Sequence, residues 1–296
     1  MINQEIFYPD TMSLSDLRNK YLDYLVHAVS YNTYKRYKCV IDEFISIVGN
    51  VKRVQLSHLE YYRLNTTTNK TINGVPRKVP RSIEGIATNL NQIKIMIRWG
   101  ERMDYIDKIC PFPRLNRPRP KPKRILSNDQ IRQILTCDKM DAEDKKLVKL
   151  YLNTGARATE FLKDNFTWDH YDAKNRFVHL GHGNKYHKVE LTDQSVKILE
   201  SWRHREYPIP YGYYYIRKHM VKASAASGVK FTAHTLRGAA GAILLRSGSS
   251  IYEASKFLRY SGVTVTEKYY IDLLNEEYRV LSQRLSNEID LLSTKQ

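Results

Sequence analysis

A short segment rich in proline and in basic residues divides this chain of 296 residues into two parts. Between Pro111 and Arg124 lie five of the ten prolines, and no acidic residue interrupts them. Proline blocks helix formation and favours an extended chain, so the segment predicts a stiff connector between two domains. The segment is either an ordinary solvated linker or an extended stretch of chain that lies along a phosphate backbone. Its basic residues are Arg114, Arg117, Arg119, Lys121, Lys123 and Arg124.

Residues 1–110 carry a helical pattern. Within Tyr31–Val48 the apolar residues recur at the spacing of one face of an amphipathic helix. Three further helices are expected at about residues 13–28, 57–64 and 82–103. The polar stretch 66–80, marked by glycine and proline, predicts a loop. The first domain is therefore expected to be a small all-helical domain of about four helices.

Residues 125–296 predict a mixed second domain. Ser127 and Gln130 have the spacing of a capping box at the start of a helix. The hydrophobic period changes between residues 166 and 191, where apolar residues flank a glycine-containing turn, which predicts a hairpin or a three-stranded meander. From residue 195 onward the pattern is mainly helical again. The fold class is thus mainly α, with a small antiparallel β-sheet in the second domain.

The charge balance indicates a polyanionic partner. The formal net charge is +17 and the pI is about 9.6. Cationic surfaces bind nucleic acid by releasing its counterions, and this reading is favoured over mere solubility for so large an excess. The candidate DNA-binding residues are Lys35, Arg36 and Lys38, which lie off the apolar stripe of their helix, with Arg117, Arg119, Lys121, Lys123 and Arg124 of the linker.

The three cysteines argue against a disulfide framework or a structural zinc site. Cys39, Cys110 and Cys137 are odd in number, far apart and without a CxxC pair. The N-terminus has neither the basic nor the apolar region of a signal peptide, and no run of apolar residues is long enough to span a membrane. We expect a soluble, cytoplasmic protein with no membrane partner.

Several scattered groups suit chemistry on a phosphodiester. Arg157 and Arg237 can match the non-bridging oxygens with their planar guanidinium groups, which stabilises the charge of the transition state. His234 lies three residues before Arg237, so a helix would place both on one face. Glu160, three residues after Arg157, can orient that arginine. Each pair taken alone is a weak signal and is more often a surface pair.

A lysine and a tyrosine would complete such a site. Lys185 lies at the tip of the expected hairpin, from where it can protonate a leaving 5′ oxygen; Lys188 is its rival. Tyr269 is the candidate nucleophile, and Tyr270 is the alternative. An ordinary tyrosine has a pKa of about 10, so attack at neutral pH needs cationic or basic help.

Taken in order, these segments resemble the catalytic domain of tyrosine recombinases, the family of phage-type integrases, Xer-type resolvases and Cre-like enzymes. Thr154–Phe161 resembles the first arginine box, TGxRxsEL. Gly181–Leu191, which reads GHGNKYHKVEL, is similar to the hairpin GKGxKxRxVPL. His234–Arg237 matches the HxLR box, and Leu258–Tyr269 resembles LGHssixtTxxY. The resemblance covers about residues 126–274 of the chain and extends to the helical N-terminal part.

The resemblance implies a role for each matched position. The two family arginines fall on Arg157 and Arg237, the catalytic lysine on Lys185 and the nucleophile on Tyr269. Tyr260 stands where the family usually has histidine or tryptophan, and a tyrosine hydroxyl can donate the same hydrogen bond to a phosphate oxygen. Two further departures, Gly238 for histidine and Glu190 for proline, remove no catalytic group.

The family implies a site-specific recombinase that clamps double-stranded DNA. Tyr269 would form a 3′-phosphotyrosyl link and free a 5′ hydroxyl, without metal, ATP or another cofactor. We expect the protein to form a homotetramer on paired DNA sites and to be a monomer or dimer when free. We also expect it to be associated with the nucleoid in the host cytoplasm. A helix expected from Asp272 to Gln296 would dock on a neighbouring protomer or pack on its own domain.

Other functions remain open on the same residues. An integrase of a mobile element or virus is favoured over a host Xer-type dimer resolvase because of the departures at Tyr260 and Gly238. A type IB topoisomerase would relax supercoils without a specific site. A catalytically inactive relative would bind DNA but form no covalent adduct.

Overall fold

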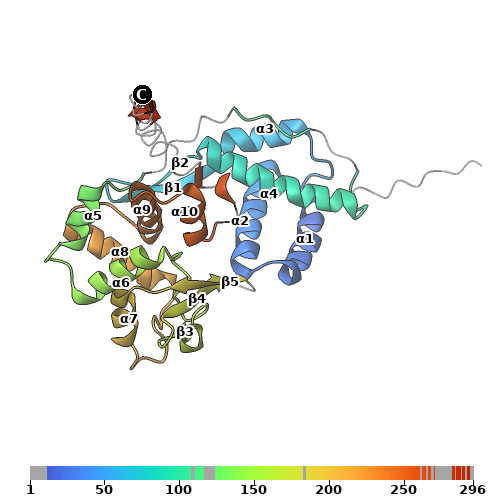
Figure 1. Ribbon diagram of the computed structural model, residues 1–296. Helices are drawn as coiled ribbons and strands as arrows, with labels where there is room; N and C mark the ends of the chain where they lie inside the picture. Colours follow the sequence, from blue (N-terminus) through green and yellow to red (C-terminus); the bar gives the residue numbers. More distant parts are fainter. Residues whose placement is uncertain are drawn as a thin grey trace, which may run out of the picture. The chain divides into compact units, whose positions relative to one another are not determined.

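The computed structural model describes residues 12–107, 111–116, 124–182, 185–260, 262–264, 266–267 and 270, and the short helical runs 282–283, 285–287, 289–290 and 292–293. The chain divides into two compact units, 1–120 and 121–296 (Figure 1). The predicted linker lies at this division, and its residues 117–123 fall outside the described residues, as does most of the expected C-terminal helix. Among the helices that the structure describes, none has the length and apolar character that a bilayer crossing requires.

Within its described residues, the first unit contains four helices and one hairpin. Its elements are α1 (Leu14–Ala28), α2 (Tyr31–Val48), α3 (Leu56–Asn65), β1 (Thr67–Ile72), β2 (Val75–Pro80) and α4 (Ile83–Arg102). Hydroxyl caps begin two of these helices, because Ser13 accepts from the Asp16 N–H and Ser82 accepts from the Gly85 N–H. The apolar stripe of α2 faces the core, where Ile41 and Phe44 are completely buried. The helix predictions for this unit are therefore confirmed.

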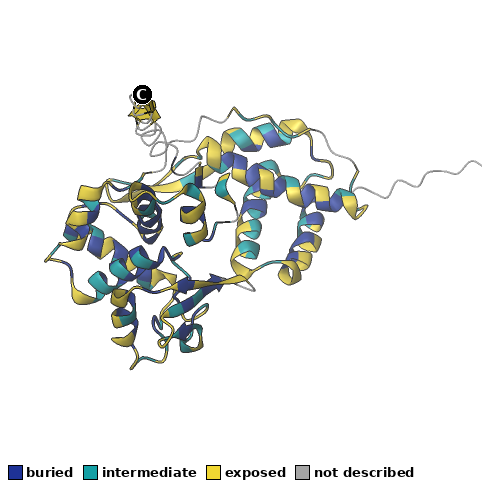
Figure 2. Ribbon diagram, viewed as in Figure 1, coloured by how far each residue is buried: buried dark blue, intermediate teal, exposed yellow. Residues whose placement is uncertain are grey.

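The loop predicted for residues 66–80 is wrong, because the segment forms the antiparallel hairpin β1–β2. Asn73 and Gly74 have φ values of 52° and 79°, as a two-residue type I′ turn requires. None of the twelve strand residues is buried (Figure 2). The strands therefore lack the alternation of buried and exposed residues that would have indicated them.

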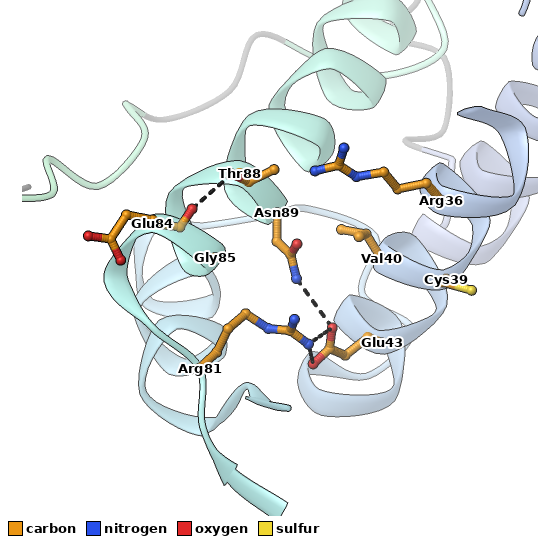
Figure 3. Close-up of a pocket in the computed structure, with 9 residues that line it drawn as sticks. All are labelled: Arg36, Cys39, Val40, Glu43, Arg81, Glu84, Gly85, Thr88 and Asn89. Atoms are coloured by element: carbon orange, nitrogen blue, oxygen red, sulfur yellow. Dashed lines mark hydrogen bonds and ion pairs between the residues drawn. The ribbon is translucent and has the colours of Figure 1, made fainter. Parts of the chain in front are cut away.

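A carboxylate network joins α2 to α4 and to the base of the hairpin. Glu43 accepts two hydrogen bonds of 2.9 Å from Arg81, one of 2.7 Å from Thr66 and one of 3.3 Å from Asn89. Glu43, Arg81 and Asn89 line a cavity of about 450 Å³, which Arg36 and Thr88 border on its other side (Figure 3). The network fixes the hairpin to the helical core through charge-assisted hydrogen bonds.

The second unit contains helices around a small antiparallel sheet of order β3-β4-β5. Its elements are α5 (Asn128–Leu135), α6 (Ala142–Thr154), the 3₁₀ turn η1 (Trp168–His170), β3 (Tyr171–Asp172), β4 (Phe177–His182), β5 (Lys185–Glu190), α7 (Asp193–Glu200), α8 (Tyr213–Ser227), α9 (Ala233–Arg246) and α10 (Ile251–Phe257). The capping box of Ser127 and Gln130 is present, and the meander replaces the hairpin alternative. The fold is thus mainly helical with small antiparallel sheets, as expected.

Candidate active site

A glycine ends α6 and directs the chain into the first arginine box. Gly155 has a φ of 55°, in the left-handed region that glycine enters at low cost. A β-carbon at this position would lie 2.9 Å from Cε1 of Phe257 and 3.0 Å from Cδ2 of Leu258. The turn therefore brings the segment after α6 against the segment after α10.

Arg157 and Glu160 form a close pair beside this turn. Arg157 Nη1 donates to Glu160 Oε1 at 2.5 Å, and the Arg157 N–H donates to Oε2 at 2.8 Å. The Glu160 side chain is 1% exposed, whereas that of Arg157 is 47% exposed. Burial raises the pKa of Glu160, but the charge of Arg259 and the hydrogen bonds from Arg157 outweigh it and leave the pKa below its ordinary value. Glu160 is thus a buried carboxylate that holds a solvent-facing arginine.

Arg237 reaches the same place from α9. Its side chain is buried, Nη1 donates to the Gly155 carbonyl at 2.5 Å, and Nη2 donates to the Leu258 carbonyl. Burial, and then the neighbouring charges of Arg157 and Arg259, lower the pKa of this guanidinium. The ring of Tyr260 lies over it, with 4.9 Å between the ring centroid and Cζ. Tyr260 is therefore placed at the arginine cluster, in a cation–π contact.

A third arginine, which the sequence reasoning missed, lies between these groups. Arg259 Nη2 donates to Glu160 Oε2 at 2.8 Å and to the Gly155 carbonyl at 3.2 Å, and its side chain is 3% exposed. The backbone carbonyl of Arg259 accepts from Arg157 Nη2 at 3.2 Å. One sequence signal could have found Arg259: the family pattern LGH has glycine at this position, and this chain departs from it with an arginine.

Two predicted residues lie on the surface of the second unit. His234 is exposed on the first turn of α9, three residues before Arg237. Lys185 is exposed at the first position of β5, opposite His182. The described hydrogen bonds and ring contacts bring together Arg157, Glu160, Arg237 and Tyr260. The catalytic roles of Lys185 and His234 stay predictions.

Of the two candidate nucleophiles, the structure describes Tyr270. Tyr269 lies outside the described residues. Tyr270 is completely buried, and its hydroxyl donates to the Gly238 carbonyl at 2.9 Å. It packs on Gly241, where a β-carbon would collide with the Tyr270 hydroxyl. The rival phenol is thus used inside the fold, which favours Tyr269 as the reactive residue.

A family model described as the phage integrase family matches residues 124–277, which is more than half of the chain. The chain belongs to the phage integrase family. It is 23% identical to a tyrosine recombinase of Thermosipho africanus, over 83% of this chain and 92% of that protein. It is 24% identical to tyrosine recombinase XerC of Shewanella sp. (strain W3-18-1), over 64% of this chain and 68% of that protein.

A solved structure of similar fold is that of the Tn1549 transposon integrase in complex with circular intermediate DNA. The TM-score is 0.68 at 17% identity, over 88% of this chain and 95% of that one. This protein is accordingly a tyrosine recombinase, a DNA-binding enzyme of DNA recombination.

The predicted DNA-binding cations of the integrase differ in their surroundings. Lys35 and Arg36 are exposed on α2, whereas Lys38 Nζ bonds Asp42 Oδ2 at 2.8 Å. Arg36 also lines the cavity beside Glu43. Arg124 is described and exposed. The other four linker cations lie outside the described residues: Arg117, Arg119, Lys121 and Lys123.

A second polar group of the integrase contains donor atoms that suit a metal. Ligand atoms of Asp141, Asp144 and His219 lie within 4.8 Å of one another. His219 Nδ1 is 2.5 Å from Asp144 Oδ1, and Lys222 Nζ bonds Asp141 Oδ2. Because Lys222 already brings a positive charge to the carboxylates, we assign this group to the contact between α6 and α8.

Proposed function

We propose that this integrase cleaves and rejoins double-stranded DNA at specific sites through a phosphotyrosyl bond at Tyr269. The observation that carries the proposal is the convergence of Arg157 and Arg237 on the Gly155 turn, together with a buried carboxylate and an aromatic ring. Two guanidinium groups from separate elements offer the charge and geometry that a phosphodiester transition state needs. The family membership and the fold of the Tn1549 integrase support the same reaction class.

The proposed reaction uses side chains of the chain alone. The phenol oxygen of Tyr269 bonds to phosphorus while the bond from phosphorus to the 5′ oxygen breaks. The phenol proton passes to His234, and Lys185 gives a proton to the leaving 5′ oxygen. The charge on the phosphate is balanced by the arginines, so this scheme assigns no step to a metal. The covalent link conserves the bond energy, so rejoining needs no ATP.

A nicked suicide duplex tests the proposal. Duplexes with a randomised core and a nick near the cleavage position are incubated with the protein, and denaturant-resistant adducts are selected and sequenced. We expect adducts with the intact protein and with Tyr270→Phe, but none with Tyr269→Phe. Tyr270→Phe should lose about 1 kcal/mol of stability, because it removes one hydrogen bond. An adduct formed by Tyr269→Phe at the intact rate would reject the proposed nucleophile.

We further propose that the exposed hairpin β1–β2 of the integrase contacts the DNA backbone. No acidic residue lies between Glu60 and Glu84. Lys70 and Arg77 are direct cross-strand partners, and like charges in that position repel each other. A neighbouring phosphate would relieve the repulsion. The prolines of β2 remove backbone donors, which disfavours a further β-strand as the partner.

For the biological role we propose an integrase of a mobile element, acting as a tetramer on two sites. The Tn1549 transposon integrase supports this role, whereas the similarity to XerC proteins supports a resolvase. A plasmid assay separates the two, since an integrase joins two different sites and a resolvase recombines two copies of one site. Relaxation of supercoiled DNA that lacks the selected site would instead indicate a topoisomerase.

A further inference from the structure

Arg259 is a buried arginine that the proposed reaction does not use. Its Nη atoms bond the carbonyls of Thr154, Gly155 and Phe257 at 3.0–3.2 Å and the carboxylate of Glu160 at 2.8 Å. Its Nε is buried and has no hydrogen-bond partner among the residues that the structure describes. One side chain thus connects the first arginine box to the turn after α10.

The backbone of Arg259 is held in an unfavourable conformation. Its φ of 54° lies in the left-handed region, where a side chain with a β-carbon is strained. Glycine would adopt the same turn without that strain. The contacts of the guanidinium must therefore offset both the strain and the burial of a charge. Such a residue is better explained by a role at the site than by its turn.

We propose that Arg259 is a positioning residue for strand cleavage, which holds one oxygen of Glu160 so that the other oxygen fixes Arg157 at the phosphate. Glu160 Oε2 is taken by Arg259 and by the Arg157 N–H, and Oε1 is left for Arg157 Nη1. The Arg259 carbonyl adds a second contact to Arg157, through Nη2. Arg259 bonds the carboxylate that holds Arg157, so it acts on Arg157 through Glu160. This inference rests on the proposed function.

The charges around Glu160 give the proposal a specific readout. Arg157 and Arg259 bond Glu160 directly, and the charge of Glu160 counters the burial that lowers the pKa of Arg237. Burial of the neighbouring Tyr151 phenol raises its pKa and keeps that phenol neutral. Without Arg259, burial still raises the pKa of Glu160 while its largest opposing charge is lost. Glu160 would then take up a proton as pH falls, and the protonated Glu160 would no longer hold Arg157.

The test measures single-turnover adduct formation on the nicked duplex between about pH 5 and about pH 8. At the upper end we expect Arg259→Gly to cleave about tenfold more slowly than the intact protein, with DNA affinity within about twofold. Toward low pH its rate should fall more steeply than that of the intact protein, and this extra loss is the acidic limb. The Arg259→Gly, Glu160→Gln double variant should be slow without this acidic limb, because the titrating group is gone.

Two more variants separate positioning from folding. Arg259→Lys keeps the charge beside Glu160, so it should cleave at an intermediate rate without an acidic limb; it also serves if the glycine variant fails to fold. Arg205→Gln removes another ion-paired arginine of the same unit and should keep the pH profile of the intact protein. An acidic limb in Arg259→Lys equal to that of Arg259→Gly, or an intact profile in Arg259→Gly, overturns the inference. Absence of any adduct with the intact protein overturns the proposed function instead.

Discussion

Glu160 lies between two arginine side chains with 1% of its own side chain exposed. Glu160→Gln would leave Arg157 and Arg259 without their counter-charge, so we expect a loss of about 3–5 kcal/mol in the free energy of unfolding. Urea denaturation measures the loss. Glu190→Gln is the matched control, because Glu190 bonds Lys188 on the surface and should contribute about 0–1 kcal/mol. Equal losses in the two variants would contradict the assignment.

The same carboxylate predicts a pH dependence of stability. The pKa of Glu160 is lower in the folded protein than its ordinary value of about 4.3. Its contribution is therefore complete above the unfolded pKa and is lost as pH falls through the folded pKa. Urea midpoints should drop below about pH 4 in the intact protein, and should drop less in Glu160→Gln.

Gly155 allows a second comparison between two residues. Gly155 and Gly228 both end helices with positive φ, of 55° and 69°, so alanine is strained at each by about 1 kcal/mol. Only at Gly155 would the β-carbon meet side chains at 2.9–3.0 Å, whereas at Gly228 the nearest atom is 3.6 Å away. Gly155→Ala should therefore be the more destabilising by about 1–3 kcal/mol, measured by urea denaturation. An equal loss at both positions would show that the Phe257 and Leu258 side chains move to accommodate the added β-carbon.

Single residues also mark the limit of the sequence reasoning. The motif spacing predicted Arg157, Glu160 and Arg237, and the structure places them together. The role of Arg259 depends on a partner 99 positions away along the chain, so no local pattern indicates it. The motif spacing chose Tyr269 over Tyr270, and the burial of the Tyr270 phenol is a feature that no local pattern indicates.

At the scale of elements, the helices were predictable and the first hairpin was not. The apolar stripe of α2 and the capping box at Ser127 are local signals, and both elements formed as predicted. The hairpin β1–β2 has an Asn-Gly turn, but its strands bury no face, so hydrophobic alternation gave no sign of them.

The hairpin offers a prediction of its own. If it contacts the DNA backbone, Lys70→Gln with Arg77→Gln should lower the slope of log affinity against log salt by about two, since each phosphate contact contributes about 0.9. Thr67→Gln with Thr71→Gln alters the opposite face without changing charge and should leave the slope unchanged. An unchanged slope in the charge variant would place the hairpin away from the DNA.

At the scale of the whole molecule, two units with separate hydrophobic cores suggest separable tasks. A fragment of residues 124–296 keeps its own core and the described arginine cluster, so we expect it to unfold cooperatively. It should form adducts on the nicked duplex with an affinity weaker by at least about tenfold, because the basic first unit is absent. Calorimetry and adduct titration measure the two effects, and affinity equal to that of the full chain would assign DNA binding to the second unit alone. The proline-rich segment lies at the division between the two units.

The anchoring of Tyr270 has a consequence for how protomers share the work. Its phenol is completely buried and donates to the Gly238 carbonyl of α9 in its own unit, and residue 269 is joined to Tyr270 by a single peptide bond. A protomer would therefore have difficulty lending residue 269 to a neighbour. Mixing an arginine-deficient protomer with a tyrosine-deficient one should restore no cleavage, so each subunit would cut only the strand that it holds.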